Sequence, residues 1–142
     1  MLELINVQKD YGRFKLNCSL EVKAGCVTGL IGQNGAGKST TINILSTLLT
    51  SDTGTINIFN LPLTSHSNKI KAQLGIVPQE IALYEDISAY HNVAFFASLY
   101  GVKKKDLPKQ VMNALTFVGL SDKKNDDPRT FSGGMKRRLN IA

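Results

Sequence analysis

Apolar and polar residues alternate strictly along residues 14–23. The apolar set is Phe14, Leu16, Cys18, Leu20 and Val22, and each residue between them is polar or charged. A repeat of two is the side-chain period of a β-strand that buries one face. The pattern predicts a half-buried strand, antiparallel to a strand over residues 2–7 and joined to it by a turn around Tyr11 and Gly12.

Three other short apolar runs are predicted as strands. Residues 26–31 lack the alternation, which suits a strand covered on both faces. A turn cluster at residues 51–54 precedes a short strand over residues 55–59. Residues 74–77 read as a strand that Pro78 stops, because proline cannot donate to a sheet.

Helical spacing appears at residues 40–49 and then throughout the second half of the chain. The first helix places Ile42, Leu45, Leu48 and Leu49 on one face. Two later stripes are Ala89, Val93, Phe96 and Tyr100, and Leu107, Val111, Leu115 and Val118, with Gly101 and Gly119 as C-terminal stops. We interpret these stripes as core packing. Strands first and helices afterwards predict an α/β core that carries a helical subdomain.

Length and composition indicate the number of domains and the cellular compartment. A chain of 142 residues with 42% hydrophobic residues has the length of one domain and enough apolar side chains for a core. It contains no apolar run of about 18 residues and no signal-peptide pattern, which predicts a soluble protein inside the cell. Cys18 and Cys26 lack any metal or redox spacing, so we expect buried thiols in a reducing compartment.

The net charge of +6 fits nucleic acid, an acidic membrane surface or a phosphate ligand. The lysine run 103–105 follows the helix stop at Gly101 and is predicted to be a solvated loop. No basic face is interleaved with aromatic residues. We therefore predict no nucleic-acid partner.

Residues 32–39 read GQNGAGKS, a phosphate-binding pattern that follows an apolar run and precedes a predicted helix. The glycines let the main chain turn tightly enough to aim successive N–H groups at one anion, beside the positive end of the helix. Lysine adds a point charge for the terminal phosphates, and serine offers a hydroxyl to Mg²⁺. The predicted nucleotide-binding residues are Gly32, Gln33, Asn34, Gly35, Ala36, Gly37, Lys38, Ser39 and Thr40.

A second candidate anion site lies at residues 131–135, which read FSGGM. Ser132 is a good N-cap for the helix-compatible stretch that follows. The amides of Gly133 and Gly134 would point outward at the positive end of that helix. By itself the short motif fits an ordinary turn and cap equally well.

At this point the chain resembles the ATP-binding cassette ATPases. Four motifs carry the resemblance in order: Tyr11, the Walker A loop at residues 32–39, Gln79 after an apolar run, and the signature segment at residues 132–135. The resemblance implies a P-loop NTPase core with an antiparallel β subdomain in residues 1–79. Residues 80–142 would form a helical subdomain that ends in the signature helix, incomplete at the C-terminus.

The resemblance also implies roles for single residues. Tyr11 would stack on adenine, unless it is only a surface aromatic in a hairpin turn. Gln79 would reach Mg²⁺ and the attacking water, and with Ser39 would be a metal ligand, unless it is an unremarkable loop amide. Ser132 and Gly134, with Gly133 between them, would contact ATP bound to a second subunit. The implied cofactors are ATP and Mg²⁺, and the implied assembly is a head-to-tail dimer.

The residues in and around these motifs, FSGGMKRRL and GIVPQE, resemble those of multidrug and lipid exporters that have separate membrane subunits. Met135 stands where most relatives carry glutamine and Phe131 where leucine is common, and neither change removes the amides of the signature segment. His91 replaces a glutamate that would complete a capping box with Ser88, so we expect a small loss of stability there.

Family members continue into a Walker B strand that ends in Asp-Glu, and then to a switch histidine. The sequence ends at Ala142, so we expect a fragment that binds nucleotide weakly, hydrolyses it negligibly and aggregates easily. The leading hypothesis is the ATP-hydrolysing subunit of an exporter, cytoplasmic and peripheral at the inner face of the cell membrane. The alternatives are a non-transport cassette ATPase acting on ribosomes or DNA, and a remnant that only binds nucleotide.

Overall fold

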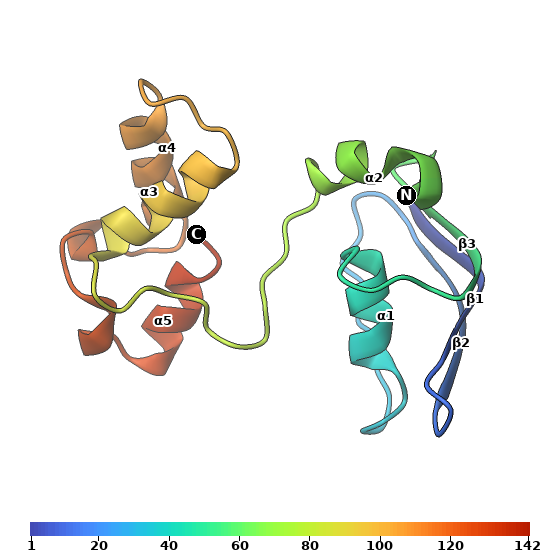
Figure 1. The fold of residues 1–142 in the computed structure, drawn as a ribbon. Coiled ribbons are helices and arrows are strands. Elements are labelled where there is room, and N and C mark those ends of the chain that lie inside the picture. The colour runs from blue at the N-terminus through green and yellow to red at the C-terminus, as the bar shows by residue number, and fades with distance from the viewer. The chain divides into compact units, whose positions relative to one another are not determined.

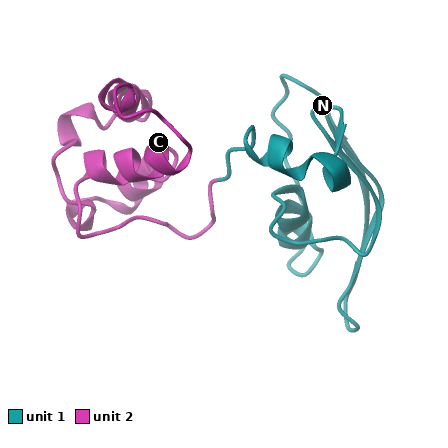
Figure 2. Ribbon diagram, turned by 45° about the horizontal axis from the view of Figure 1, so that its top comes forward, with its two compact units in different colours: residues 1–76 teal, residues 77–142 magenta.

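The computed structural model describes residues 1–142, which fall into two units with separate buried cores. Unit 1 comprises residues 1–76 and unit 2 residues 77–142 (Figure 2). Unit 1 combines a sheet with two helices, and unit 2 is built from helices alone (Figure 1).

An antiparallel sheet forms the framework of unit 1. Its strands are β1 (Leu2–Asp10), β2 (Lys15–Val22), β3 (Thr53–Ile58) and β4 (Leu61–Pro62), in the order β2-β1-β3-β4. The predicted hairpin is confirmed, because β1 and β2 pair from Leu2 with Val22 to Asp10 with Lys15. Its alternating apolar residues point toward the more buried side of β2.

Two helices, α1 (Lys38–Leu45) and α2 (Leu63–Lys71), pack against this sheet (Figure 1). Ile44 of α1 and Ile70 of α2 are fully buried in one core with Leu4, Val7, Leu16, Ile56 and Ile58. The prediction for the first helix is wrong about where the helix ends and about which face is buried. It starts at Lys38 and stops at Leu45, and this phase turns Thr41 and Ile44 inward while Ile42 and Leu48 are exposed.

The strands predicted over residues 26–31 and 74–77 are absent, which corrects the sequence interpretation. Neither segment has regular secondary structure, and Val27 and Ile31 are fully exposed. A strand needs a neighbour for its N–H and C=O groups, and the sheet of unit 1 consists of β1 to β4 alone. The prediction of two buried thiols is also wrong. Cys26 is exposed because no strand covers its segment, and Cys18 in β2 is only half-buried.

Unit 2 packs three α-helices, α3 (Ala89–Leu99), α4 (Leu107–Phe117) and α5 (Gly133–Leu139), and two short 3₁₀ helices, η1 (Ser121–Lys123) and η2 (Pro128–Thr130). Its core is Ala89, Val93, Val111, Leu115, Val118, Leu120, Phe131 and Leu139. The second predicted stripe is therefore confirmed as core, with Leu107 packed against it. The first is confirmed only for Ala89 and Val93, because Phe96 is half-buried outside this core and Tyr100 lies past the end of α3 and is exposed. Both predicted stops have positive φ, 81° at Gly101 and 66° at Gly119.

Candidate nucleotide-binding site

The glycine loop leads directly into α1 in unit 1. Its lysine, Lys38, is the first helical residue, and its Nζ donates to the carbonyls of Gly32 at 2.7 Å and Gln33 at 2.8 Å. These bonds hold the positive charge over the loop, whose residues 32–36 are exposed. Ser39 is exposed in the first helical turn beside this charge, and its hydroxyl is a ligand type that Mg²⁺ accepts.

Gly37 marks the closest approach of the loop to the sheet. It is the N-cap of α1 with φ of 92°, a left-handed conformation that favours glycine. A Cβ there would lie 2.7 Å from Leu16 Cδ1 and 3.1 Å from Phe14 Cζ. The β1–β2 hairpin therefore fixes where the loop enters the helix, and any side chain at this position would displace one of them.

Tyr11 sits in the turn of the same hairpin. Its main-chain N–H donates to the Phe14 carbonyl at 2.9 Å, and its exposed ring stacks on Phe14 with centroids 6.3 Å apart. Phe14 in turn lies beside Gly37. Unit 1 thus brings Tyr11 and the glycine loop to the same end of the sheet, while the contact of Tyr11 with adenine stays a prediction.

The signature segment begins α5 in unit 2. Ser132 is the N-cap, and its Oγ accepts from the Met135 N–H at 3.3 Å. Gly133 and Gly134 are exposed, and a Cβ on either would meet nothing within 4 Å. Phe131, which replaces the common leucine, is buried in the core and so serves packing.

Gln79 lies in an irregular, exposed segment before α3. Its carbonyl accepts from Nη1 of Arg137 on α5 at 3.0 Å, so the structure brings Gln79 and the signature helix together within unit 2. The candidate residues thus fall into two groups. Tyr11 and residues 32–40 belong to unit 1, and Gln79 and residues 132–134 belong to unit 2.

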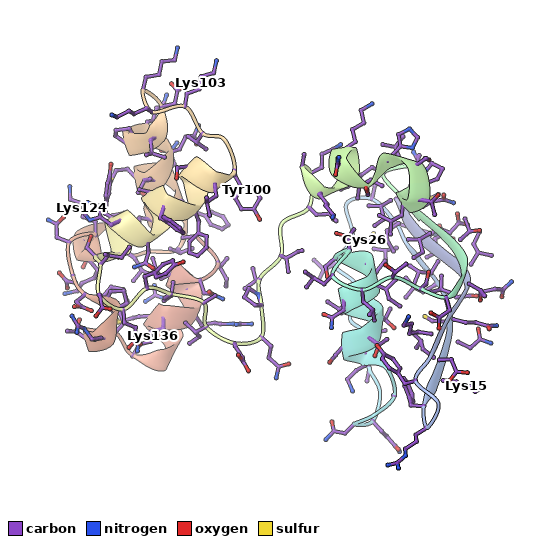
Figure 3. The ribbon with its side chains drawn as sticks, in the orientation of Figure 1. Lys15, Cys26, Tyr100, Lys103, Lys124 and Lys136 are labelled. Carbon is purple, nitrogen blue, oxygen red and sulfur yellow. The ribbon has the colours of Figure 1, made fainter.

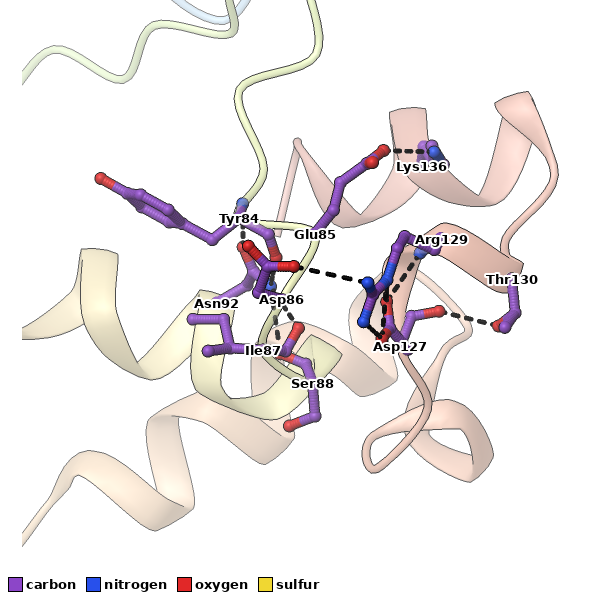
Figure 4. Close-up of polar contacts among 10 residues, drawn as sticks. All are labelled: Tyr84, Glu85, Asp86, Ile87, Ser88, Asn92, Asp127, Arg129, Thr130 and Lys136. Carbon is purple, nitrogen blue, oxygen red and sulfur yellow. Dashed lines mark hydrogen bonds and ion pairs between the residues drawn. The ribbon is translucent and has the colours of Figure 1, made fainter.

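Asn92 is a residue that sequence reasoning did not assign to this site. It is buried at the start of α3, where its Oδ1 accepts from the Tyr84 N–H at 2.8 Å and its Nδ2 donates to the carbonyls of Tyr84, Ile87 and Ser88 (Figure 4). A buried amide with four partners anchors the chain that enters α3. The signal in the sequence is an asparagine four residues after the N-cap Ser88 in a mainly apolar helix.

In the capping box that the sequence predicts to be incomplete, the histidine side chain contacts the N-cap serine. Ser88 Oγ accepts from the His91 N–H at 3.3 Å and contacts His91 Nδ1 at 2.8 Å. The imidazole thus bonds the capping hydroxyl, whereas a glutamate in its place would reach back to the main-chain N–H of Ser88.

Charged side chains of unit 2 form ion pairs just before α3 but no metal centre. Arg129 pairs with Asp86 and Asp127, and Lys136 pairs with Glu85 (Figure 4). The hydrogen bond from Arg129 lowers the pKa of Asp127 below its ordinary value. No group of three His, Cys, Asp or Glu side chains could hold a metal ion.

Basic side chains extend over both units, as the labelled lysines show (Figure 3). None of the helices is long and apolar enough to cross a membrane.

The sequence of residues 32–39, with its lysine in the first turn of a helix, is the motif of a P-loop nucleotide-binding protein. The sequence model of the ABC transporter family matches residues 16–142. The chain therefore belongs to the ABC transporter family.

Similar proteins support this assignment. The linearmycin resistance ATP-binding protein LnrL of Bacillus subtilis is 42% identical over the whole chain, which spans 46% of that protein. CbiO1 of Clostridium perfringens, part of the ABC transporter complex cbiONQ, has a TM-score of 0.86 at 28% identity over 99% of this chain and 59% of its own. The cassette MJ0796, a dimer bound to ADP and Pi, has a TM-score of 0.81 at 26% identity over 99% of this chain and 67% of its own.

Proposed function

We propose that this chain is the ATP-binding part of an ABC transporter that exports its substrate through separate membrane subunits. Residues 32–40 would hold the phosphates, and Ser39 would bind Mg²⁺. The observation that carries the proposal is the Lys38 ammonium, held by loop carbonyls at the start of α1 next to the glycine that touches the hairpin. A main-chain cradle with one fixed cation is suited to a triphosphate.

The remaining residues take roles that follow from membership of the family. Tyr11 stacks on the adenine ring, and Gln79 takes part in binding Mg²⁺ and the attacking water. Ser132, Gly133 and Gly134 contact the ATP of a second subunit in a head-to-tail dimer. The exposed amides at the start of α5 and the dimeric form of MJ0796 support this assignment.

The partners would be membrane-spanning subunits, with this protein attached to them at the inner face of the cell membrane. The role of LnrL in linearmycin resistance favours export, and the complex of cbiO1 favours a separate transport partner. Specificity for the transported molecule would lie in those partners.

ATP hydrolysis would need an Asp-Glu pair after an apolar strand, because phosphoryl transfer to water requires a positioned base. The 142-residue sequence contains no such pair. We therefore propose that this polypeptide by itself binds MgATP without appreciable turnover.

Binding of MgATP by the 142-residue chain, measured by calorimetric titration, tests the proposal. We expect Lys38→Ala to weaken binding at least about tenfold, because a charge-assisted contact to phosphate contributes about 1.5–3 kcal/mol. Lys69→Ala, on the exposed surface of α2, is the matched control. Equal affinities for the parent chain and Lys38→Ala would refute the proposal.

Phosphate release from ATP tests the second half of the proposal on the same samples. We expect the parent chain to release phosphate no faster than Lys38→Ala. Magnesium-dependent turnover well above that variant would show that the polypeptide holds a complete catalytic site.

A further inference from the structure

One helix of unit 2 holds the segment that carries Gln79. Nη1 of Arg137 donates to the carbonyls of Pro78 at 2.6 Å and Gln79 at 3.0 Å. Asn140 Oδ1 accepts from the Ala82 N–H at 3.0 Å, at the C-cap of the same helix α5.

A fourth contact from α5 reaches the segment further along. Lys136 Nζ pairs with Glu85 Oε1 at 2.5 Å (Figure 4). Lys136, Arg137 and Asn140 thus occupy two successive turns of α5 and bind four positions between 78 and 85. The helix that begins with the signature segment therefore restrains this stretch of chain along most of its length.

The Gln79 end of the segment has no other hydrogen bond apart from the one between Ala82 and Asn140. Residues 78–82 belong to no helix or strand, and all of them are exposed, including the apolar Ile81. Hydrogen bonds from a guanidinium are among the stronger ones, and one nitrogen here serves two adjacent carbonyls. The position of the Gln79 main chain therefore depends on Arg137.

The other end of the segment is held independently. The side chain of Asn92 accepts from the main-chain N–H of Tyr84 and donates to the Tyr84 carbonyl. It also donates to the carbonyls of Ile87 and Ser88. Asn92 belongs to α3, so these bonds do not involve α5. Loss of the Arg137 contact would leave residues 78–82 held only by the bond from Ala82 to Asn140, and would leave Tyr84 in place.

We propose that Arg137 is a positioning residue that ties Gln79 to the signature helix, so that Gln79 and residues 132–134 move as one body. The proposal rests on the proposed function, in which Gln79 and the signature segment contact bound nucleotide. A shift of α5 would carry Gln79 with it, and a displaced Gln79 would pull on α5.

Arg138 provides a matched control from the same helix. Its Nη1 donates to the carbonyls of Val118 at 2.9 Å and Gly119 at 3.2 Å, at the end of α4. The chemistry equals that of Arg137, one guanidinium nitrogen on two adjacent carbonyls. Only the target differs, since Arg138 does not touch the Gln79 segment.

Amide hydrogen exchange of the 142-residue chain tests the contact directly. The Ala82 amide donates to Asn140, and the local opening that exposes it also separates the segment from Arg137. We expect Arg137→Met to speed exchange at this amide about tenfold, because that opening no longer breaks the Arg137 contact, which is equivalent to about one hydrogen bond. The Tyr84 amide should keep its rate because Asn92 holds it. Arg137→Lys should restore part of the protection, since an ammonium can still donate to these carbonyls.

Two results would overturn the positioning role. One is an Ala82 exchange rate in Arg137→Met equal to that of the parent chain. The other is an equal rise in Arg138→Met, which would mean general loosening of unit 2. If Arg137→Met fails to fold, judged by rapid exchange at Tyr84, Arg137→Gln replaces it under the same criteria.

ATP titrations with and without Mg²⁺ test the link to Gln79. We expect Gln79→Ala and Arg137→Met to reduce the Mg²⁺-dependent gain in affinity by similar factors, and the double variant to reduce it no further, because both act through one group. Additive losses would overturn the link.

Lys38→Ala separates the two proposals. Unchanged ATP affinity in that variant would contradict the proposed nucleotide binding, whereas the hydrogen-exchange result tests only the role of Arg137.

Discussion

Asn92 fixes the entry to α3 through four hydrogen bonds from a side chain that is 1% exposed. We expect Asn92→Ala to lower the free energy of unfolding by about 2–4 kcal/mol, because it leaves the partner groups of a buried amide unsatisfied. Urea titration measures the change. Asn113→Ala, exposed on α4, is the control and should change stability by less than about 0.5 kcal/mol. Equal effects of the two variants would contradict the anchoring role.

Gly37 sets the distance between the phosphate loop and the hairpin. We expect Gly37→Ala to destabilise the chain by about 1–3 kcal/mol and to weaken MgATP binding, because its Cβ would collide with Leu16 at a positive φ. Urea titration and calorimetry measure the two effects. Gly75→Ala is the matched control, since a Cβ there meets nothing within 4 Å. A Gly37→Ala chain as stable as Gly75→Ala would show that the loop tolerates a side chain.

Among helices and strands, the sequence predicted those features that depend on residues close together in the chain. The β1–β2 hairpin follows from alternation over adjacent residues, and the ends of α3 and α4 follow from Gly101 and Gly119. Residues 26–31 and 74–77 have equally apolar patterns but no strand beside them. Pairing partners come from elsewhere in a fold, so an apolar run by itself does not determine whether a strand forms.

Substitutions in the first of these segments test its irregular, uncovered state. We expect Val27→Ser to change the free energy of unfolding by less than about 0.5 kcal/mol, because the side chain is fully exposed. Ile44→Ala, fully buried in α1, should lower it by about 2–5 kcal/mol. Urea titration compares the two. A loss above about 2 kcal/mol in Val27→Ser would mean that residues 26–31 are packed in solution.

At the scale of the whole chain, exposed ion pairs give stability a defined dependence on pH. Hydrogen bonds from Lys15, Lys9 and Arg129 lower the pKa values of Asp10, Asp52 and Asp127 below the ordinary value of 3.8. The unfolded chain binds protons near that value, whereas the folded chain does so only at lower pH. Their stabilising contribution is therefore complete above about pH 4 and is lost as the pH falls further.

Urea midpoints between pH 6 and pH 3 measure this dependence. We expect the urea concentration at the unfolding midpoint of the parent chain to decrease once the pH is below about 4. The midpoint of Asp52→Asn should decrease less steeply in this range, because the variant lacks one of the titrating carboxylates. Asp122→Asn, whose carboxyl forms no ion pair, is the control. Parallel curves for the parent chain and Asp52→Asn would contradict the assigned role of Lys9.

The sequence by itself was sufficient to predict the chemistry of the candidate site. Residues 32–39 have to be contiguous to cradle a phosphate, so their order suffices to predict the loop, and the family assignment agrees with it. The same holds for Ser132 as an N-cap, since its partner Met135 is three residues away.

Only the tertiary structure decided which distant residues support that chemistry. Arg137 meets Pro78 and Gln79 across more than fifty positions, and Phe14 meets Gly37 through the packing of the hairpin on α1. Contacts of this kind depend on how elements pack in space, and neither composition nor periodicity encodes the pairing. The placement of Tyr11 on Phe14 near the loop, and of Gln79 beside α5, therefore emerged from the fold.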